Sequence, residues 1–187
     1  MGHRFSLWGL LGLALTLAGC DASTKWMAVH HLKNKAPMEV NSFFDFRYVE
    51  NHDVAFHLMR WIPTSSRFYV ILILGMITST ILIVLFVVFA RRFRWLSIGF
   101  VCILSGAFGN ISDRIIRGFV VDFIHVHYYT YSWPVFNVAD ICVSVGIGII
   151  MIAIFTAPTQ PPFHLSEPPP PLPPHKPFPK PLPSIHR

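Results

Sequence analysis

Long apolar stretches alternate with short polar ones along most of the chain. Four of the apolar stretches are long enough to cross a bilayer, at about 5–29, 68–90, 95–112 and 138–157. An apolar run of about 20 residues spans the hydrocarbon core of a membrane as an α-helix. The pattern therefore predicts an all-α membrane fold with four transmembrane helices, joined by long loops at about 30–67 and 113–137.

The first of these loops carries a different pattern, with a period of two. Phe44, Phe46 and Tyr48 alternate with other residues, and residues 54–58 repeat the alternation after a polar stretch at 50–53. A period of two is typical of a β-strand, and the polar stretch is typical of a turn. We expect a small β-sheet here that lies on the outer membrane surface with its aromatic face toward the lipid.

The composition is that of an integral membrane protein. Of the 187 residues, 53% are hydrophobic and 13% are charged, whereas about a quarter are charged in a typical soluble domain. The same composition, with 17 Phe and 5 Trp, excludes disorder for most of the chain. The net charge of +6 does not indicate a nucleic-acid partner, because the basic residues lie at the ends of the apolar spans and form no stripe.

The basic residues also predict the orientation of the helices. Cytoplasmic loops of membrane proteins collect Arg and Lys, and the short turn between the second and third spans is Arg91-Arg92-Phe93-Arg94. With this turn in the cytoplasm, alternation of the spans puts both long loops outside. We therefore expect a multi-pass protein with both termini in the cytoplasm.

Proline dominates residues 158–187. Thirteen of the 16 prolines lie in this segment, which leaves few backbone donors for a helix or a central strand. Extended polyproline is the expected conformation. The segment is either a ligand for an SH3-like partner or a semi-rigid, disordered cytoplasmic tail. We favour the tail, because composition alone carries the signal.

Four carboxylates stand at the outer ends of the predicted helices. The chain has nine acidic residues, and these four are Asp21, Asp113, Asp122 and Asp140. A carboxylate at membrane depth is costly unless it is paired, hydrated or protonated, so such residues are functional candidates. Two of the four follow an asparagine in an Asn-x-x-Asp pattern, Asn110 with Asp113 and Asn137 with Asp140. This spacing puts both side chains on one helix face, where the amide can hydrogen-bond the carboxyl.

Clustered carboxylates allow three kinds of function. Two carboxyls that lie close together in a low-dielectric site share a proton. One of them then activates a water and the other polarises a carbonyl, which hydrolyses a peptide without a metal. The same acids can form the proton relay of a transporter, although transporter sites usually lie at the bilayer midplane. They can also simply hydrogen-bond neighbouring helices, and the spacing alone does not decide among the three.

Five segments are similar, in order and in sequence, to the motifs of a known family. They are Asp21–Lys25, Asn51–Phe56, Leu104–Arg114, Gly118–Phe123 and Trp133–Asp140. Together they resemble the lipoprotein signal peptidase (signal peptidase II) family over about residues 5–157. The resemblance implies an aspartyl endopeptidase of the bacterial inner membrane, with four helices and a small periplasmic β-cradle. It also implies that the substrates are diacylglyceryl-modified prolipoproteins, cut just before the lipidated cysteine.

The same resemblance implies roles for individual residues. Asp122 and Asp140 match the catalytic pair, which titrates as a unit, so the residue that holds the proton is left open. The positions that match residues of the pocket and substrate site are Asp21, Lys25, Asn51, Asn110, Asp113, Arg114 and Asn137. We expect no metal or cofactor, since the chain has no His-Glu-x-x-His motif of a metalloprotease. We expect a monomer whose partners are lipidated prolipoproteins and membrane lipid.

One residue departs from the family pattern. Asp53 stands where the family usually has glycine. Glycine permits a positive φ or a close approach of the substrate backbone, whereas aspartate adds charge and bulk beside the pocket. Because aspartate also occurs in left-handed turns, we favour a tolerated turn residue over an altered specificity.

The first span also contains a lipobox-like sequence, Leu17-Ala18-Gly19-Cys20. As part of a signal peptide, it would make Cys20 the lipidated first residue of a lipoprotein or scaffold that displays the proline tail. However, the segment Asp21–Lys25 needs the preceding helix as its support. We therefore favour an uncleaved first span, with Cys20 as a buried thiol.

Histidines offer a further candidate chemistry in the loops. His125 and His127 share one face if their segment is extended, and four more lie in the other loop, His30, His31, His52 and His57. No third ligand has convincing spacing for a metal site. We therefore expect interfacial polar residues here.

Overall fold

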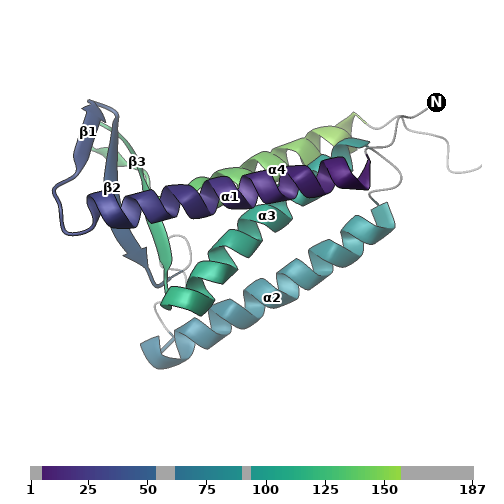
Figure 1. The fold of residues 1–187 in the computed structure, drawn as a ribbon, viewed down its shortest axis with the longest axis horizontal. Coiled ribbons are helices and arrows are strands. Elements are labelled where there is room, and N and C mark those ends of the chain that lie inside the picture. The colour runs from purple at the N-terminus through teal and green to yellow at the C-terminus, as the bar shows by residue number, and fades with distance from the viewer. Residues whose placement is uncertain (1–5, 54–61, 90–93, 157–187) are drawn as a thin grey trace, which may run out of the picture. The chain divides into compact units, whose positions relative to one another are not determined.

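Four helices and a four-stranded sheet make up the described part of the protein. The structure, a computed structural model, describes residues 6–53, 62–89 and 94–156. The helices are α1 (Leu7–Leu32), α2 (Thr64–Phe89), α3 (Arg94–Arg117) and α4 (Val138–Phe155). The strands are β1 (Met38–Asn41), β2 (Phe44–Asn51), β3 (Val120–Tyr128) and β4 (Tyr131–Ser132). Figure 1 shows the helices running alongside one another, with the sheet at one end of them.

Each of the four helices is long and apolar enough to cross a membrane. α3 is the central helix, because it packs against α1, α2 and α4. Half of its most apolar stretch is buried, against 6% of the corresponding stretch of α1 or α2. The outer helices therefore turn large apolar side chains outward, as lipid-facing helices do. The predictions of four long apolar helices and of a small antiparallel sheet are confirmed.

The sheet is assembled from both long loops. Its strands follow the order β1-β2-β3-β4 and pair antiparallel. Sequence analysis placed β2 correctly but did not predict β3, which is the central partner of β2. The expected partner strand at 54–58 lies outside the described residues. β3 was missed because it is buried over most of its length and so lacks a simple alternation of polar and apolar residues.

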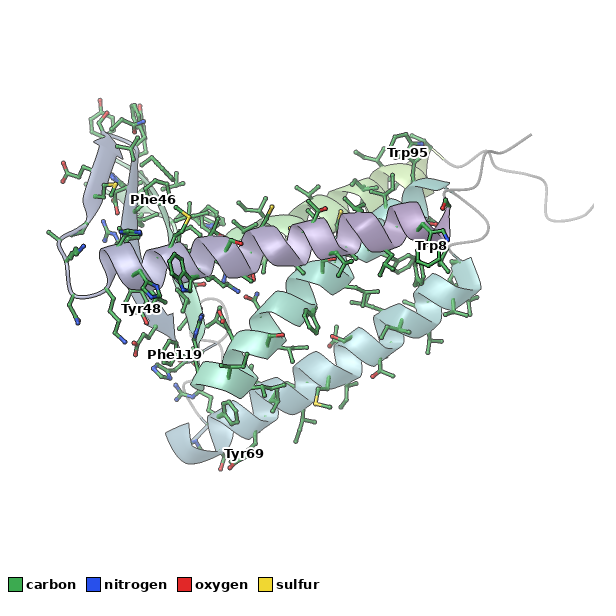
Figure 2. The ribbon with its side chains drawn as sticks, in the orientation of Figure 1. Trp8, Phe46, Tyr48, Tyr69, Trp95 and Phe119 are labelled. Carbon is green, nitrogen blue, oxygen red and sulfur yellow. The ribbon has the colours of Figure 1, made fainter. Side chains whose placement is uncertain are left out.

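A small apolar core joins the sheet to the end of α1. Ala28 and Leu32 of α1 pack with Val121 and Phe123 of β3, and all four side chains are buried. Phe46 and Tyr48 of β2 lie on this part of the molecule (Figure 2) and pack against the same core. The aromatic residues of the predicted strand thus cover α1 and β3.

Aromatic side chains lie at both ends of the helices. Trp8 and Trp95 stand at the end away from the sheet, and Tyr69 stands at the sheet end of α2 (Figure 2). All three side chains are exposed. Trp and Tyr favour the two interfaces of a membrane, so this arrangement fits helices that cross a bilayer.

Two sequence-based expectations about the first and third helices need correction. α1 runs without a break through the lipobox-like segment, but Cys20 is exposed on its surface and is not a buried thiol. α3 continues to Arg117, beyond the expected end at 112. An ion pair between Arg117 and Asp113, one helical turn apart, supports this extra turn, with 2.7 Å between Nη1 and Oδ1.

Glycines allow α3 and α4 to pack closely. A Cβ atom at Gly106 would collide with the carbonyl oxygen of Ala139 and would lie 2.8 Å from Val143 Cγ2. A Cβ atom at Gly146 would lie 2.6 Å from the carbonyl oxygen of Gly99. Small residues at such crossings let helix backbones approach each other in membranes.

We expect Gly146→Ala to destabilise the protein by about 1–3 kcal/mol, because the added methyl group must push α3 and α4 apart. Gly148→Ala is the matched control on the same helix, since a Cβ atom there meets nothing within 4 Å. Thermal unfolding of the two purified variants in detergent measures the effect. Equal melting temperatures would contradict the close packing.

Candidate active site

A cavity of about 1150 Å³ lies where the sheet meets the ends of α3 and α4. Its lining includes five of the residues singled out by sequence, Asn51, Asn110, Arg114, Asp122 and Asp140. The other four are buried and do not line it: Asp21, Lys25, Asp113 and Asn137. The fold thus brings all nine residues into one region, from α1, α3, α4 and the two central strands.

The start of α4 positions Asp140. Asn137 is the N-cap of the helix, and its side chain accepts a hydrogen bond from the backbone N–H of Asp140. The backbone N–H of Asn137 donates in turn to Asp140 Oδ2, at 3.2 Å. This capping box satisfies free N–H groups of the first turn. It therefore holds Asp140 by the same bonds that begin the helix.

Asp122 reaches the cavity from β3. Its side chain is almost fully buried, with 2% of the residue exposed. Asn51 Nδ2 donates to Oδ2 at 2.8 Å, and Asn137 Nδ2 donates to Oδ1 at 2.7 Å. Burial raises the pKa of Asp122 to about 6, against the lowering effect of the bond from Asn51, and the charge of Asp140 adds to the rise.

Two asparagines connect the carboxyl groups. Asn110 Nδ2 donates to Asp140 Oδ1 at 2.8 Å, while Asn110 Oδ1 accepts from Asn137 Nδ2 at 3.1 Å. The Asn137–Asp140 pair predicted from the Asn-x-x-Asp spacing is present. The Asn110–Asp113 pair is not, because Asn110 faces α4 and bonds the carboxyl of Asp140. Residue spacing along one helix could not reveal this hydrogen bond from α3 to α4.

A buried ammonium group organises the other two carboxylates. Lys25 Nζ lies 2.8 Å from Asp21 Oδ2 and 3.2 Å from Asp113 Oδ2. It also donates to Asn110 Oδ1 at 3.1 Å. Asp21 in turn accepts from the backbone N–H of Ala139 in the first turn of α4, at 2.9 Å. Sequence analysis missed Gly109, at which a Cβ atom would collide with the Asp21 carboxylate.

This arrangement is suited to acid–base chemistry on a bound chain. Asp122 and Asp140 both line the cavity, and Asn137 links them. Its side chain donates to Asp122 and its backbone N–H donates to Asp140. A carboxyl with a pKa of about 6 exchanges its proton near neutral pH. Together with a second carboxyl group in the same cavity, it can take a proton from water and donate one to a carbonyl or a leaving group.

Comparison with known proteins identifies the family. The model of the signal peptidase (SPase) II family matches residues 13–156, which include every residue of the site. The chain belongs to the signal peptidase II family. Three relatives, each named lipoprotein signal peptidase, support this. The protein of Syntrophotalea carbinolica is 36% identical over 149 residues, which cover 77% of this chain and 89% of the relative.

Two further relatives match to a similar extent. The Francisella tularensis protein is 32% identical over 145 residues, covering 77% of this chain and 90% of the relative. The Acinetobacter baumannii protein is 33% identical over 145 residues, covering 78% of this chain and 82% of the relative.

The fold is similar to two solved structures of bacterial membrane enzymes. One has a TM-score of 0.75 at 24% identity and covers 86% of this chain and 97% of its own. The other has a TM-score of 0.70 at 25% identity, and the match covers 84% of this chain and 99% of the solved one.

Asp53, which stands where a glycine was expected, has an arginine partner at both its side chain and its backbone. Its carboxylate accepts from Arg67 Nη1 at 2.9 Å, and its backbone carbonyl accepts from Arg114 Nη2 at 3.2 Å. Asn51 Oδ1 accepts from the Asp53 N–H at 2.9 Å, which forms a turn. Among the described residues other than glycine, a positive φ occurs only at Asn34 and Tyr129. Asp53 is thus a turn residue, but the expectation of a left-handed one is wrong.

The cavity wall also contains residues that sequence analysis did not assign to the site. Arg47 of β2, His125 of β3 and Ser132 of β4 line it. Arg47 forms two hydrogen bonds with the buried carboxylate of Asp45, one to each oxygen. The signal that could have found them is the strand character of residues 120–128, which puts His125 opposite Asp45.

We expect Lys25→Met to destabilise the protein by about 3–5 kcal/mol, because it leaves the buried carboxylate of Asp21 without its cation. Asp113 keeps its ion pair with Arg117. Lys33→Met is the matched control, since the ion pair of Lys33 with Glu50 is partly exposed, at 43% and 35% of the two side chains. Such surface pairs contribute little to stability. Unfolding of both variants in detergent compares them, and an equal loss would contradict the role of Lys25.

The raised pKa of Asp122 predicts a pH dependence of stability. The native state keeps the proton up to about pH 6, whereas the unfolded chain releases it near pH 4. Between these values the native state binds more protons, so this contribution to stability falls as the pH rises, by at most about 3 kcal/mol. We expect the stability of wild type relative to Asp122→Asn to decrease from pH ~4 to pH ~6 and then to level off. A flat difference across this range would contradict the raised pKa.

Proposed function

We propose that this protein is an aspartic endopeptidase that cuts diacylglyceryl-modified prolipoproteins just before the lipidated cysteine. Membership of the signal peptidase II family implies that it removes signal peptides from prolipoproteins. The proposal adds the catalytic groups, Asp122 and Asp140, and the position of the cut. The observation that carries it is the pair of carboxyls in one cavity, joined through Asn110 and Asn137.

The mechanism uses one proton shared by the pair. The ionised carboxyl takes a proton from a water molecule, whose oxygen attacks the scissile carbonyl carbon, while the protonated carboxyl hydrogen-bonds the carbonyl oxygen. When the C–N bond breaks, the leaving amine nitrogen receives a proton from the pair. One proton has then been taken from water and one delivered to the amine. The pair returns to its starting charge, with no covalent intermediate.

The neighbouring residues act as supports in this proposal. Asn51 and Asn137 donate to Asp122, and Asn110 donates to Asp140. These bonds hold each carboxyl in one orientation. Arg114 lines the same cavity and can hold a carbonyl group of the substrate. Lys25, Asp21 and Asp113 lie one layer further in and fix Asn110 and the start of α4.

The same proposal sets the sheet on the periplasmic side of a bacterial inner membrane. The basic sequence Arg91-Arg92-Phe93-Arg94 between α2 and α3 favours the cytoplasm for the end of these helices away from the sheet, which puts both termini there. The acyl chains of the substrate belong in the outer leaflet, so the cut must occur near that surface. The cavity at the sheet end of the helices supports this. Its apolar wall on α4, at Val143, suits an acyl chain.

We further propose that residues 1–157 form the peptidase domain and act as a monomer, with residues 158–187 as a cytoplasmic tail. The first span stays uncleaved in this proposal, because Asp21 and Lys25 of α1 support the site. The transporter alternative is disfavoured, because the carboxyl pair lies at the sheet end of the helices and not at their middle.

The direct test is cleavage of a synthetic diacylglyceryl prolipoprotein by the purified protein in detergent. We expect Asp122→Asn and Asp140→Asn each to reduce the rate by at least about 100-fold, because each removes one of the two acid–base groups. Glu39→Gln, which changes an exposed acid outside the cavity, is the matched control and should cut at the wild-type rate.

Two outcomes would contradict the proposal. Cleavage by either aspartate variant at more than a tenth of the wild-type rate would remove the aspartic mechanism. Failure of folded wild-type protein to cut lipidated substrates, with a positive control from a related enzyme, would remove the assigned reaction. Mass spectrometry of the products checks that the cut falls before the lipidated cysteine.

A further inference from the structure

A cluster of imidazole and carboxylate groups lies on the sheet, separate from the carboxyl pair. Asp45 of β2 stands opposite His125 of β3 in the strand register, and His127 lies two residues further along β3. Asp45 Oδ2 is 2.8 Å from His125 Nδ1 and 3.3 Å from His127 Nε2. One atom of each residue lies within 4.8 Å of the other two. Sequence analysis found only two of these three groups, and Asp45 supplies the third from 80 residues away.

More groups converge on one oxygen than it can bond. Arg47 Nη2 lies 2.8 Å from Asp45 Oδ2, in addition to the two imidazole nitrogens. A carboxylate oxygen has two lone pairs, so three donors exceed its capacity. If Arg47 uses one of them, the two imidazoles compete for the other. A cation between the imidazoles and the carboxylate removes this competition, since each nitrogen then offers its own lone pair to the ion.

We propose that Asp45, His125 and His127 bind a divalent transition-metal ion of the Zn²⁺ class. Ligands about 2.0–2.1 Å from a tetrahedral Zn²⁺ lie about 3.3 Å apart. The distance from Asp45 Oδ2 to His127 Nε2 already has this value, and the distance to His125 Nδ1 must open by about half an ångström. The two rings are stacked with centroids 5.0 Å apart, so both face the same side of β3. A fourth position is left for water.

The surrounding residues have the contacts that support metal ligands. His125 Nε2 lies 2.7 Å from Ser132 Oγ. When Nδ1 binds the ion, Nε2 carries the proton and donates it to Ser132, which fixes the tautomer. Arg47 donates to both oxygens of Asp45 and orients the carboxylate.

The nature of the ligands selects the ion. Two imidazole nitrogens and one carboxylate oxygen suit Zn²⁺, Co²⁺ or Ni²⁺ better than Mg²⁺ or Ca²⁺, which prefer sites made of oxygen ligands alone. The positive charge of the Arg47 guanidinium group repels a cation and so lowers the affinity of the site for the metal ion. The ion would fasten β2 to β3, the two strands that also carry Asn51 and Asp122. It takes no part in the proposed hydrolysis, so the two proposals stand independently.

Titration of the untagged, full-length protein with Co²⁺ in detergent tests the site. Tetrahedral Co²⁺ has intense visible absorption bands that the hydrated ion lacks. We expect one equivalent of Co²⁺ to bind with this spectrum and to be displaced by Zn²⁺. His127→Ala removes a ligand that is 28% exposed and should weaken binding by more than about tenfold, the least that even a supporting residue costs. His127→Gln gives a second variant that keeps a hydrogen-bonding side chain.

His31→Ala is the matched control, because His31 is an exposed histidine outside the cluster. It should bind Co²⁺ as wild type does, and the remaining histidines contribute equally to every variant. The proposal is overturned if wild type gives only the spectrum of the hydrated ion. It is also overturned if both His127 variants, checked for folding by their melting temperatures, bind as tightly as wild type.

Discussion

The ammonium group of Lys25 determines the direction of the hydrogen bonds in the candidate active site. Because Lys25 has donors only, Asn110 must present its oxygen to it, and the amide nitrogen of Asn110 is left to donate to Asp140. Asn137 is oriented in the same way, since its oxygen accepts from the first turn of α4. Both asparagines therefore donate an amide proton to a carboxyl group, Asn110 to Asp140 and Asn137 to Asp122. Burial opposes these bonds, and the pKa of Asp122 near 6 is the net result.

This arrangement depends on close contact between helices. The carboxylate of Asp21 reaches the first turn of α4 past Gly109, where any side chain would occupy its space. The glycines at the crossing of α3 and α4 bring Asn110 within reach of Asp140 in the same way. The carboxylates of Asp21 and Asp140 are thus satisfied by groups of a neighbouring helix, as polar groups within a membrane protein must be.

The sheet contributes to two sites through the same pair of strands. β2 and β3 bring Asn51 next to Asp122 at one end of their pairing, and Asp45 next to His125 at the other. A register shift between Phe46 and Val49 separates the two ends. The first site contains the residues that match the motifs of signal peptidase II. The second uses Asp45, Arg47, His125 and His127, and it would hold the two strands together.

The sequence by itself determined the four apolar helices and the identity of most site residues. Helices that cross a membrane must be long and apolar, so local composition is sufficient to find them. The nine site residues were found from motifs and from the cost of placing charges at membrane depth. The tertiary structure alone decided which partners these residues have. Asn110 bonds Asp140 and not Asp113, β3 pairs with β2, and Asp45 meets His125 from 80 residues away. These contacts depend on how helices and strands pack against one another. The spacing of residues along one segment carries no information about a partner residue that lies on a different segment.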